Sequence, residues 1–491
     1  MKKEKNHLHK TVLLGVLVVV FLLGANYIPS YTIGGFKTKE INILSDLTLK
    51  NKNNLIDDSF YTDSLNRVRD SLQRVHQQKM LASIEDSIKQ VRIDSIKKAS
   101  LARMDSLGKS VIAIEDFSAG GDALDHFFKV LQERRRLKRP VRVAFLGDSF
   151  IEGDIIVADV REQLQNKYGG KGVGFVPMAS VVATYTPTVK HTFQNWKSFS
   201  IIQKKDGVEH FTPQGQVFEP LDNASASFEG VTWKPNLDRY SRARLIYVNN
   251  GQARVGVSVN RNDTSWTQLP SNGTVDQFVS KGNINQISYT FDNPENVRVL
   301  GVALEDSTGV SVDNYSVRGN SGLWMTRVDQ GLSAQLDRIM NYDLVVLQYG
   351  VNVVETDVVS YSGYRQSMVK VINHLKTCMP NASFLVLSIG DRSTQEDGEF
   401  VTMPGVHGMV KAQKQIAQEC GVAFWNMFEA MGGENSMVRF VENNWASKDY
   451  THISHAGGRR IANALVKALF LEADKYEAIY QVENNQTYDE K

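Results

Sequence analysis

A serine, a histidine and an aspartate in this chain have the residue types and the spacing needed for nucleophilic catalysis. Ser149 ends a Gly-Asp-Ser triplet, and Asp449 and His452 are the first and last residues of the run Asp-Tyr-Thr-His near the C-terminus. A serine hydroxyl becomes a strong nucleophile only when a base removes its proton. A carboxylate that holds one ring nitrogen of a histidine leaves the other nitrogen to act as that base. The pattern therefore predicts Ser149 as nucleophile, His452 as base and Asp449 as the partner of His452.

Two further loops could stabilise the negative oxygen that such an attack creates. Asn352 ends the run Gly-Val-Asn, and Gly319 lies in the run Val-Arg-Gly-Asn-Ser-Gly. The backbone amides of Ser149 and Gly319 and the side chain of Asn352 would together form an oxyanion hole. The loss of one such donor typically costs about 3–4 kcal/mol of transition-state stabilisation.

A metal site is the alternative for the C-terminal histidines. His455 completes a His-x-x-His pattern with His452, and Asp449 is nearby. No other His or Cys cluster in the sequence completes a ligand set. We therefore expect no metal and no other cofactor, and we expect His455 to cap or pack the last helix. The chain has 2 cysteines, Cys378 and Cys420, and the sequence leaves open whether they form a disulfide.

Short apolar runs that predict buried strands precede the candidate residues. Ser149 follows the run 141–146, and Asn352 follows the run 343–349. Further strands are predicted at 383–389 and 422–425, and helices at 122–137, 155–167, 364–376, 409–419 and 456–475. Alternating strands and helices predict a parallel α/β sheet. Ligands of such sheets bind beyond the carboxyl ends of the strands, which is where we expect the site.

The sequence pattern changes between residues 184 and 310. Helical periodicity gives way to short alternating runs, which are separated by turn signals such as Asn-Asn-Gly and Asp-Asn-Pro. This pattern predicts an inserted β-sandwich. The insert carries Trp196, Trp233 and Trp266. We expect these rings to fill the core of the insert; the alternative is that they are exposed and stack on sugar rings.

The N-terminal region predicts export and a spacer. Lys2, Lys3, Lys5 and Lys10 precede an uncharged run over residues 11–28. As a helix this run would measure about 27 Å, close to the thickness of a bilayer core. We expect a single-pass signal anchor in the inner membrane with the remaining chain outside the cytoplasm, and a cleaved signal peptide is the alternative.

Residues 51–110 have apolar positions at helical spacing, which predicts a helical stalk. Its repeated Asp-Ser triplets also resemble O-glycosylation acceptor sites of some Gram-negative bacteria.

The composition sets limits on the class of protein. Lys plus Arg is 56 and Asp plus Glu is 54, a net charge of +2, which gives no reason to expect nucleic-acid binding. The predicted parts are a tail and anchor at 1–30, a stalk at 31–110, the two halves of an α/β domain at 111–183 and 311–478, the insert at 184–310 and a polar tail at 479–491.

The blocks around Ser149, Gly319, Asn352 and His452 resemble those of the SGNH (GDSL-type) esterase and lipase superfamily. The resemblance covers about residues 141–185 and 311–475. It implies a flavodoxin-like three-layer fold with a parallel sheet, interrupted here by the insert. It also implies the catalytic and oxyanion-hole roles given above for these residues and for Asp449.

A narrower resemblance is to bacterial peptidoglycan O-acetylesterases and O-acetyltransferases, which carry a carbohydrate-binding-like module between their first two blocks. Two departures from these relatives are Phe150, where a histidine is common, and the loosely matching run 319–322. The resemblance implies a serine esterase that removes acetyl or small acyl groups from a cell-envelope glycan. Asp391 and Arg392 follow a predicted strand and would bind that glycan as an anionic or acetylated chain; the alternative is that they form a surface ion pair.

Two other functions would suit the same sequence. An O-acyltransferase would use the same residues to move acyl groups onto an envelope polysaccharide, and it would receive them from a membrane-bound O-acyltransferase partner. A non-catalytic envelope glycan-binding protein would retain the fold without turnover.

Overall fold

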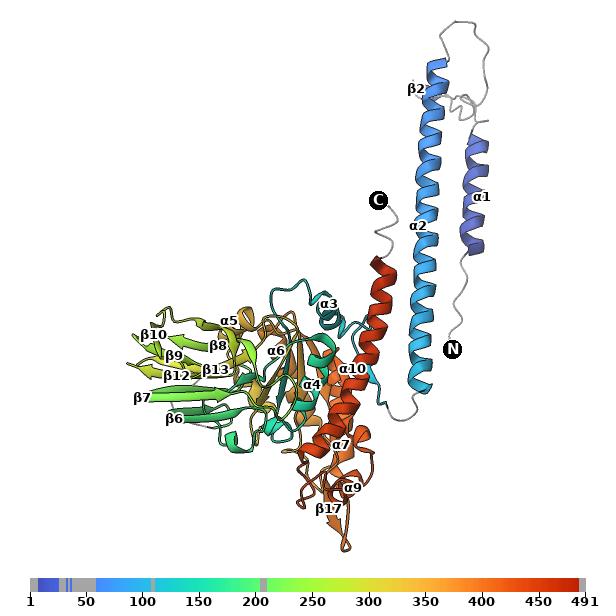
Figure 1. Ribbon diagram of the computed structural model, residues 1–491. Coiled ribbons are helices and arrows are strands. Elements are labelled where there is room, and N and C mark those ends of the chain that lie inside the picture. Colours follow the sequence, from blue (N-terminus) through green and yellow to red (C-terminus); the bar gives the residue numbers. More distant parts are fainter. Residues whose placement is uncertain are drawn as a thin grey trace. The chain divides into compact units, whose positions relative to one another are not determined.

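A computed structural model describes residues 8–25, 32–33, 36–37, 59–106, 111–203 and 210–484 (Figure 1). The chain divides into two compact units, Met1–Asp86 and Ser87–Lys491. The first unit contains helix α1 (Leu8–Ala25), the strand pair β1 (Thr32–Ile33) and β2 (Phe36–Lys37), and the start of helix α2 (Ser59–Ser106).

The predicted membrane anchor does not find support in the structure. Among the described residues, no helix has both the length and the apolar character needed to cross a bilayer. The anchor was expected over residues 11–28; α1 ends at Ala25, and residues 26–28 lie outside the described part. Within the predicted stalk, α2 forms one helix of 48 residues.

The second unit contains the predicted parallel α/β sheet, which is confirmed. Its strand order is β14-β4-β15-β16-β19-β3, and only the edge strand β3 is antiparallel to its neighbour. The strands are β14 (Val310–Ser316), β4 (Val141–Gly147), β15 (Leu344–Gln348), β16 (Ser383–Leu387), β19 (Ala423–Trp425) and β3 (Ile114–Asp116). Because the central strands β4, β15 and β16 are buried on both faces, they read in the sequence as mostly apolar runs.

Helices cover both faces of this sheet and complete three layers. Side chains of β4 alternate between two cores: Val143 and Phe145 pack on one side, and Ala144 and Leu146 pack on the other. The first core includes α3 (Asp125–Glu133), α4 (Val157–Tyr168), α8 (Met427–Met431), α9 (Ser436–Glu442) and α10 (His455–Asn484). The second includes α5 (Gln330–Met340), α6 (Ser362–Cys378) and α7 (Gly405–Cys420). Because α10 extends to Asn484, part of the predicted polar tail is helical.

The insert differs from the predicted sandwich of two sheets. Its strands form a single nine-stranded antiparallel sheet, because the long strand β7 pairs with β6, β12 and β13. The sheet already begins at β5, before the predicted boundary at 184. Its strands are β5 (Gly174–Val176), β6 (Lys190–Ser200), β7 (Gln216–Glu229), β8 (Tyr240–Asn249), β9 (Arg254–Val259), β10 (Ser265–Gln268), β11 (Val275–Ile284), β12 (Gln286–Asp292) and β13 (Val297–Glu305).

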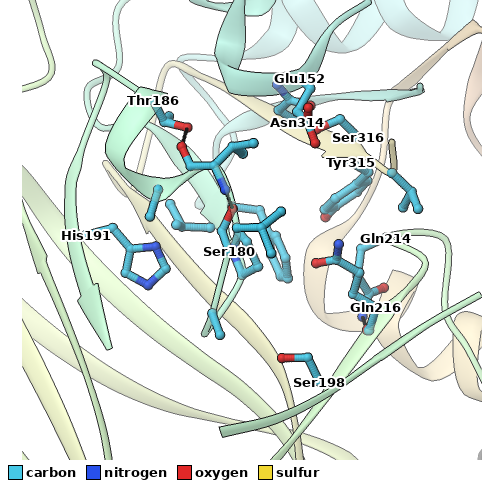
Figure 2. A pocket seen from close by; sticks show the side chains of 18 of the residues that line it. Glu152, Ser180, Thr186, His191, Ser198, Gln214, Gln216, Asn314, Tyr315 and Ser316 are labelled. Atoms are coloured by element: carbon cyan, nitrogen blue, oxygen red, sulfur yellow. Dashed lines mark hydrogen bonds between the residues drawn. The ribbon is translucent and has the colours of Figure 1, made fainter. Parts of the chain in front are cut away.

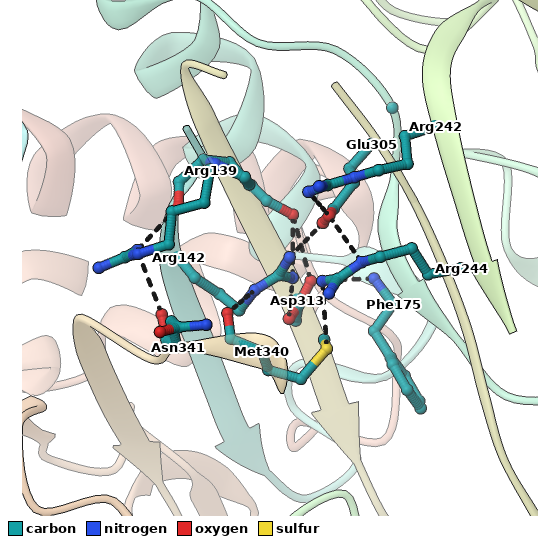
Figure 3. Close-up of polar contacts among 12 residues, drawn as sticks. Arg139, Arg142, Phe175, Arg242, Arg244, Glu305, Asp313, Met340 and Asn341 are labelled. Atoms are coloured by element: carbon teal, nitrogen blue, oxygen red, sulfur yellow. Dashed lines mark hydrogen bonds and ion pairs between the residues drawn. The ribbon is translucent and has the colours of Figure 1, made fainter. Parts of the chain in front are cut away.

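Buried ion pairs join the insert to the α/β sheet (Figure 3). Arg142 of β4 is fully buried, donates to Asp313 of β14 at 2.7 Å and also pairs with Glu305 of β13. Arg242 and Arg244 of β8 reach the same Glu305 carboxylate at 2.6 and 3.0 Å. Burial alone would raise the pKa of Glu305, but the three guanidinium groups lower it to about 2. The insert is therefore held to the sheet by charges that water does not reach.

Candidate active site

The nucleophile candidate lies directly after the central strand β4. Gly147 ends this strand, and a Cβ at that position would come within 2.8 Å of the Gln348 carbonyl oxygen on the neighbouring strand β15. Only glycine allows this close approach. Two residues later, Ser149 is 6% exposed at the carboxyl edge of the sheet.

The base candidate is held by a turn before α10. Asp449 accepts hydrogen bonds from the backbone amides of Thr451 and His452 at 2.9 and 3.0 Å, and its second oxygen lies 2.8 Å from Nδ1 of His452. Partial burial would raise the pKa of Asp449, but these hydrogen bonds and the His452 ring hold it below its usual value. Asp449 is therefore an ionised acceptor at neutral pH.

The structure brings the three distant residues together. Nε2 of His452 lies 3.2 Å from Oγ of Ser149. A carboxylate accepts only, so Nδ1 carries the proton that faces Asp449, and Nε2 is left as an acceptor for the Ser149 hydroxyl. The arrangement has the hydrogen-bond reach that nucleophile activation requires.

The oxyanion-hole candidates lie around the same serine. Gly319 has a φ of +80°, a left-handed conformation that favours glycine. Within the described residues, the backbone amides of Ser149 and Gly319 donate to no other protein group. The Asn352 side chain donates to Asp148 at 3.2 Å and to the Asn320 carbonyl at 3.3 Å. Asn352 would therefore exchange one of these two long contacts for the oxyanion.

Asp148 is a site residue whose part the sequence analysis missed. It is fully buried and accepts from the Phe150 amide at 2.9 Å as well as from Asn352. Burial raises the pKa of Asp148 to about 7, although these hydrogen bonds oppose the shift. The sequence signal that could have indicated this role is the position of Asp148 in the Gly-Asp-Ser triplet. Asp148 connects the nucleophile loop to the Asn352 loop and is a positioning residue.

The predicted substrate-binding pair has protein partners in the structure. Asp391 is 1% exposed and accepts from the Met437 amide at 2.7 Å. Arg392 donates to the Val351 and Val354 carbonyls at 3.2 and 3.3 Å, which supports the loop that carries Asn352. Both residues thus act on the framework of the site, and contact of either with substrate stays a prediction.

A hairpin that the sequence did not indicate supports the turn of His452. Strands β17 (Ser393–Glu396) and β18 (Glu399–Thr402) form this hairpin. The Phe400 ring stacks on the Tyr450 ring at 3.6 Å, and the Ser393 amide donates to the Tyr450 carbonyl at 3.1 Å. Tyr450 has a φ of +54°, which is costly for an aromatic residue and needs such support.

Other candidates from the sequence lie away from the triad. Cys378 and Cys420 are buried free thiols, so no disulfide joins them. Trp233 and Trp266 are 40% and 43% exposed, so the core expectation is wrong for both. Trp196 is partly buried and donates to the Ser225 carbonyl at 2.8 Å.

His455 begins α10, and its ring packs edge-on against Trp233 at 5.3 Å. Among the described residues, no group of three or more His, Cys, Asp or Glu side chains is placed to hold a metal ion.

Comparison with known proteins identifies the fold. The sequence matches no protein-family model and no curated protein. A solved structure of a peptidoglycan O-acetylesterase matches with a TM-score of 0.61 and 20% identity, covering 74% of this chain and 99% of that chain. The acetylxylan esterase Axe2 from Geobacillus stearothermophilus matches with a TM-score of 0.25 and 19% identity, covering 33% and 73% of the two chains. The chain thus has the fold of the first protein, which is the fold that the SGNH resemblance implies.

Proposed function

We propose that the protein is a serine esterase that removes acetyl or other small acyl groups from a cell-envelope glycan. One observation carries the proposal: the Ser149 hydroxyl, the His452 ring and the Asp449 carboxylate form a continuous hydrogen-bonded chain. Such a chain activates serine for attack on an ester carbonyl. The fold shared with a peptidoglycan O-acetylesterase supports a glycan ester as the substrate.

In the proposed reaction, Nε2 of His452 takes the Ser149 proton while Oγ bonds to the ester carbonyl carbon. The amides of Ser149 and Gly319 and the Asn352 side chain donate to the resulting oxyanion. The bond between the carbonyl carbon and the sugar oxygen then breaks, and His452 returns its proton to that oxygen. Water attacks the acyl-enzyme with His452 again as base, which releases the acid and restores Ser149.

The substitution Ser149→Ala tests this function. It should abolish hydrolysis of an aryl acetate and release of acetate from O-acetylated peptidoglycan, because no nucleophile remains. The melting temperature should stay close to that of the wild type, since the change removes one oxygen atom. Substantial residual turnover in a folded Ser149→Ala protein would contradict the proposal.

Product analysis separates hydrolysis from acyl transfer, in which a glycan hydroxyl would replace water. Free acid released without an acceptor supports the esterase. Ester formation that depends on an added acceptor glycan, with little free acid, would assign the protein to the O-acyltransferases and imply a membrane-bound acyl donor protein. Binding of glycan with no reaction of Ser149 toward a serine-directed phosphonate would indicate a binding protein.

We further propose that the enzyme acts on the extracytoplasmic side of the inner membrane. The support is the basic N-terminus followed by the uncharged run 11–28, an order typical of export signals. Digestion of the second unit by protease added to spheroplasts is expected, and protection from it would contradict this location.

A further inference from the structure

A cavity of about 410 Å³ lies between the insert and the carboxyl end of strand β14 (Figure 2). Strands β5, β6 and β7, together with the segment between β5 and β6, supply much of its wall, and the segment from Asn314 to Arg318 supplies the side nearest the α/β sheet. Its volume is in the range that holds a small organic ligand. The catalytic role proposed above leaves this cavity without a function.

The cavity adjoins the candidate active site. Arg318 precedes Gly319 in the chain, and its guanidinium pairs with Glu152, which follows Ser149 by one turn. The Val317 amide donates to the Gly147 carbonyl at 3.0 Å, so this wall of the cavity runs beside the nucleophile loop. A ligand held in the cavity would therefore lie close to the nucleophile loop.

The cavity wall presents a hydrogen-bond acceptor without a partner. Gln214 is 4% exposed, and its Nε2 donates to the Gln216 carbonyl at 3.2 Å. Its Oε1 is buried and has no partner among the described residues. Figure 2 shows the Gln214 side chain among those that line the cavity. A buried acceptor without a partner is costly, which favours a ligand that donates to it.

A second acceptor comes from His191 on β6. Its ring stacks on Phe228, and Nε2 lies 3.2 Å from the Met178 carbonyl. A carbonyl only accepts, so Nε2 carries a proton and Nδ1 of the neutral ring is an acceptor. Burial lowers the pKa of His191 to about 4, which agrees with a neutral ring at physiological pH.

The charged groups at the cavity are neutralised by partners within the protein. Glu152 pairs with Arg318, and Asp154 binds Arg161 at 2.8 Å. Aromatic and aliphatic side chains make up much of the remaining wall, including Phe199, Phe218 and Leu300. The cavity therefore suits a neutral ligand that has both apolar faces and hydrogen-bond donors.

We propose that this cavity is a subsite for a neutral sugar unit of the glycan substrate, bound through hydroxyl or amide N–H donors to Gln214 and His191. The proposal rests on the esterase function and specifies its substrate. Sugar rings combine apolar faces with donors, whereas an alkyl chain of a long acyl group would leave the Gln214 oxygen without a partner. In this proposal the cavity binds the sugar unit next to the ester, and the triad reacts with the acyl group.

Binding to the Ser149→Ala protein tests the subsite without turnover. N-acetylglucosamine tetramer and xylotetraose serve as probes by calorimetry: both carry hydroxyl donors, and only the first carries amide donors. Saturable binding of at least one is expected. The substitution Gln214→Met keeps the side-chain volume but removes the acceptor, and it should weaken that binding by about tenfold. In the protein that retains Ser149, Gln214→Met should leave kcat/KM for an aryl acetate, which carries no sugar, within about twofold of the wild-type value.

Two further variants complete the test, one as a control and one as a second change in the cavity. Gln268→Met, at an exposed position of β10, is the matched control and should bind as the parent does. Phe193 lines the cavity and is 40% exposed, so Phe193→Ala should remove an apolar contact without unfolding the protein if Gln214→Met proves unstable. Unchanged sugar affinity in both cavity variants would overturn the subsite. So would a preference for octanoyl over acetyl esters that Gln214→Met leaves intact, because the cavity would then hold the acyl chain.

The two proposals fail separately. Sugar binding by the Ser149→Ala protein together with a wild type that hydrolyses no ester would contradict the esterase and retain the subsite. Active ester hydrolysis with no effect of the cavity variants on sugar binding would contradict the subsite alone.

Discussion

At the scale of single residues, Asn352 gives the most direct test of the oxyanion hole, because it is the proposed donor that belongs to a side chain and can be removed by substitution. Asn352→Ala should lower kcat by about 10²–10³, because it removes a donor that acts only when negative charge develops on the substrate. Steady-state kinetics with an aryl acetate measures the effect, and Asn443→Ala, at an exposed position, is the control. Equal kcat in Asn352→Ala and wild type would remove Asn352 from the hole.

Asp148 gives the site a dependence on pH. Burial raises its pKa to about 7, so the folded protein holds a proton that the unfolded chain releases near pH 4. Stability should therefore fall as pH rises from about 4 to about 7 and change little above that range. Asp148→Asn should flatten this slope in urea unfolding at a series of pH values. It should also lower kcat, because Asn352 loses its carboxylate acceptor.

Motifs in the sequence were sufficient to predict that Ser149, Asp449 and His452 come together, but the supporting contacts were not predictable. Ser149, Asp449 and His452 carry their signal in residue type and spacing. The role of Asp148 depends on Asn352, which is distant in the chain, and on the burial of both. Asp391 and Arg392 lie after a strand as expected, yet their partners are backbone groups and the Ser436 hydroxyl, which no sequence pattern reports.

At the scale of elements, the hairpin β17–β18 should determine how well His452 is aligned. Phe400→Ala removes the ring that stacks on Tyr450, which leaves the strained turn of Asp449 and His452 less fixed. We expect kcat to fall by about tenfold to hundredfold with little change in melting temperature, since small misplacements of catalytic groups are costly. Phe400→Tyr keeps the stacking and should retain activity. A kcat for Phe400→Ala equal to that of Phe400→Tyr would show that the hairpin does not align the site.

The parallel strands were predictable as elements because burial on both faces produces continuous apolar runs, as in β4, β15 and β16. The curled sheet of the insert was not. Alternating runs predict strands, but they do not report which strands pair. In a sandwich these strands would form two separate sheets. Here the pairing of β5 with β13 and the several partners of β7 connect them into one sheet.

At the scale of the whole molecule, the buried ion pairs make the insert part of one cooperative structure. Glu305→Gln leaves Arg142 and Arg244 without a full counter-charge in the interior, and it should destabilise the protein by about 3–5 kcal/mol. Chemical denaturation measures the loss. Lys190→Gln, which removes an exposed ion pair with Glu229, should cost under about 1 kcal/mol. Similar costs for the two variants would contradict the role given to the buried cluster.

This cluster also decides how the function of the insert can be studied. Excision of residues 184–310 removes Glu305 and leaves Arg142 buried without that partner, so loss of activity in such a protein would report misfolding. Point variants in the cavity, such as Gln214→Met, separate binding from folding. The fold and the cavity therefore have to be tested in the intact chain.

The central claim is that Ser149 forms a covalent acyl-enzyme with His452 as its base. Rapid quenching of the wild type with an activated acetyl ester, followed by peptide mass spectrometry, measures this directly. The account predicts an acetyl group on the peptide that contains Ser149, and strongly reduced labelling in His452→Ala. Turnover with no acetylated intermediate on Ser149, or equal labelling in His452→Ala, would contradict it.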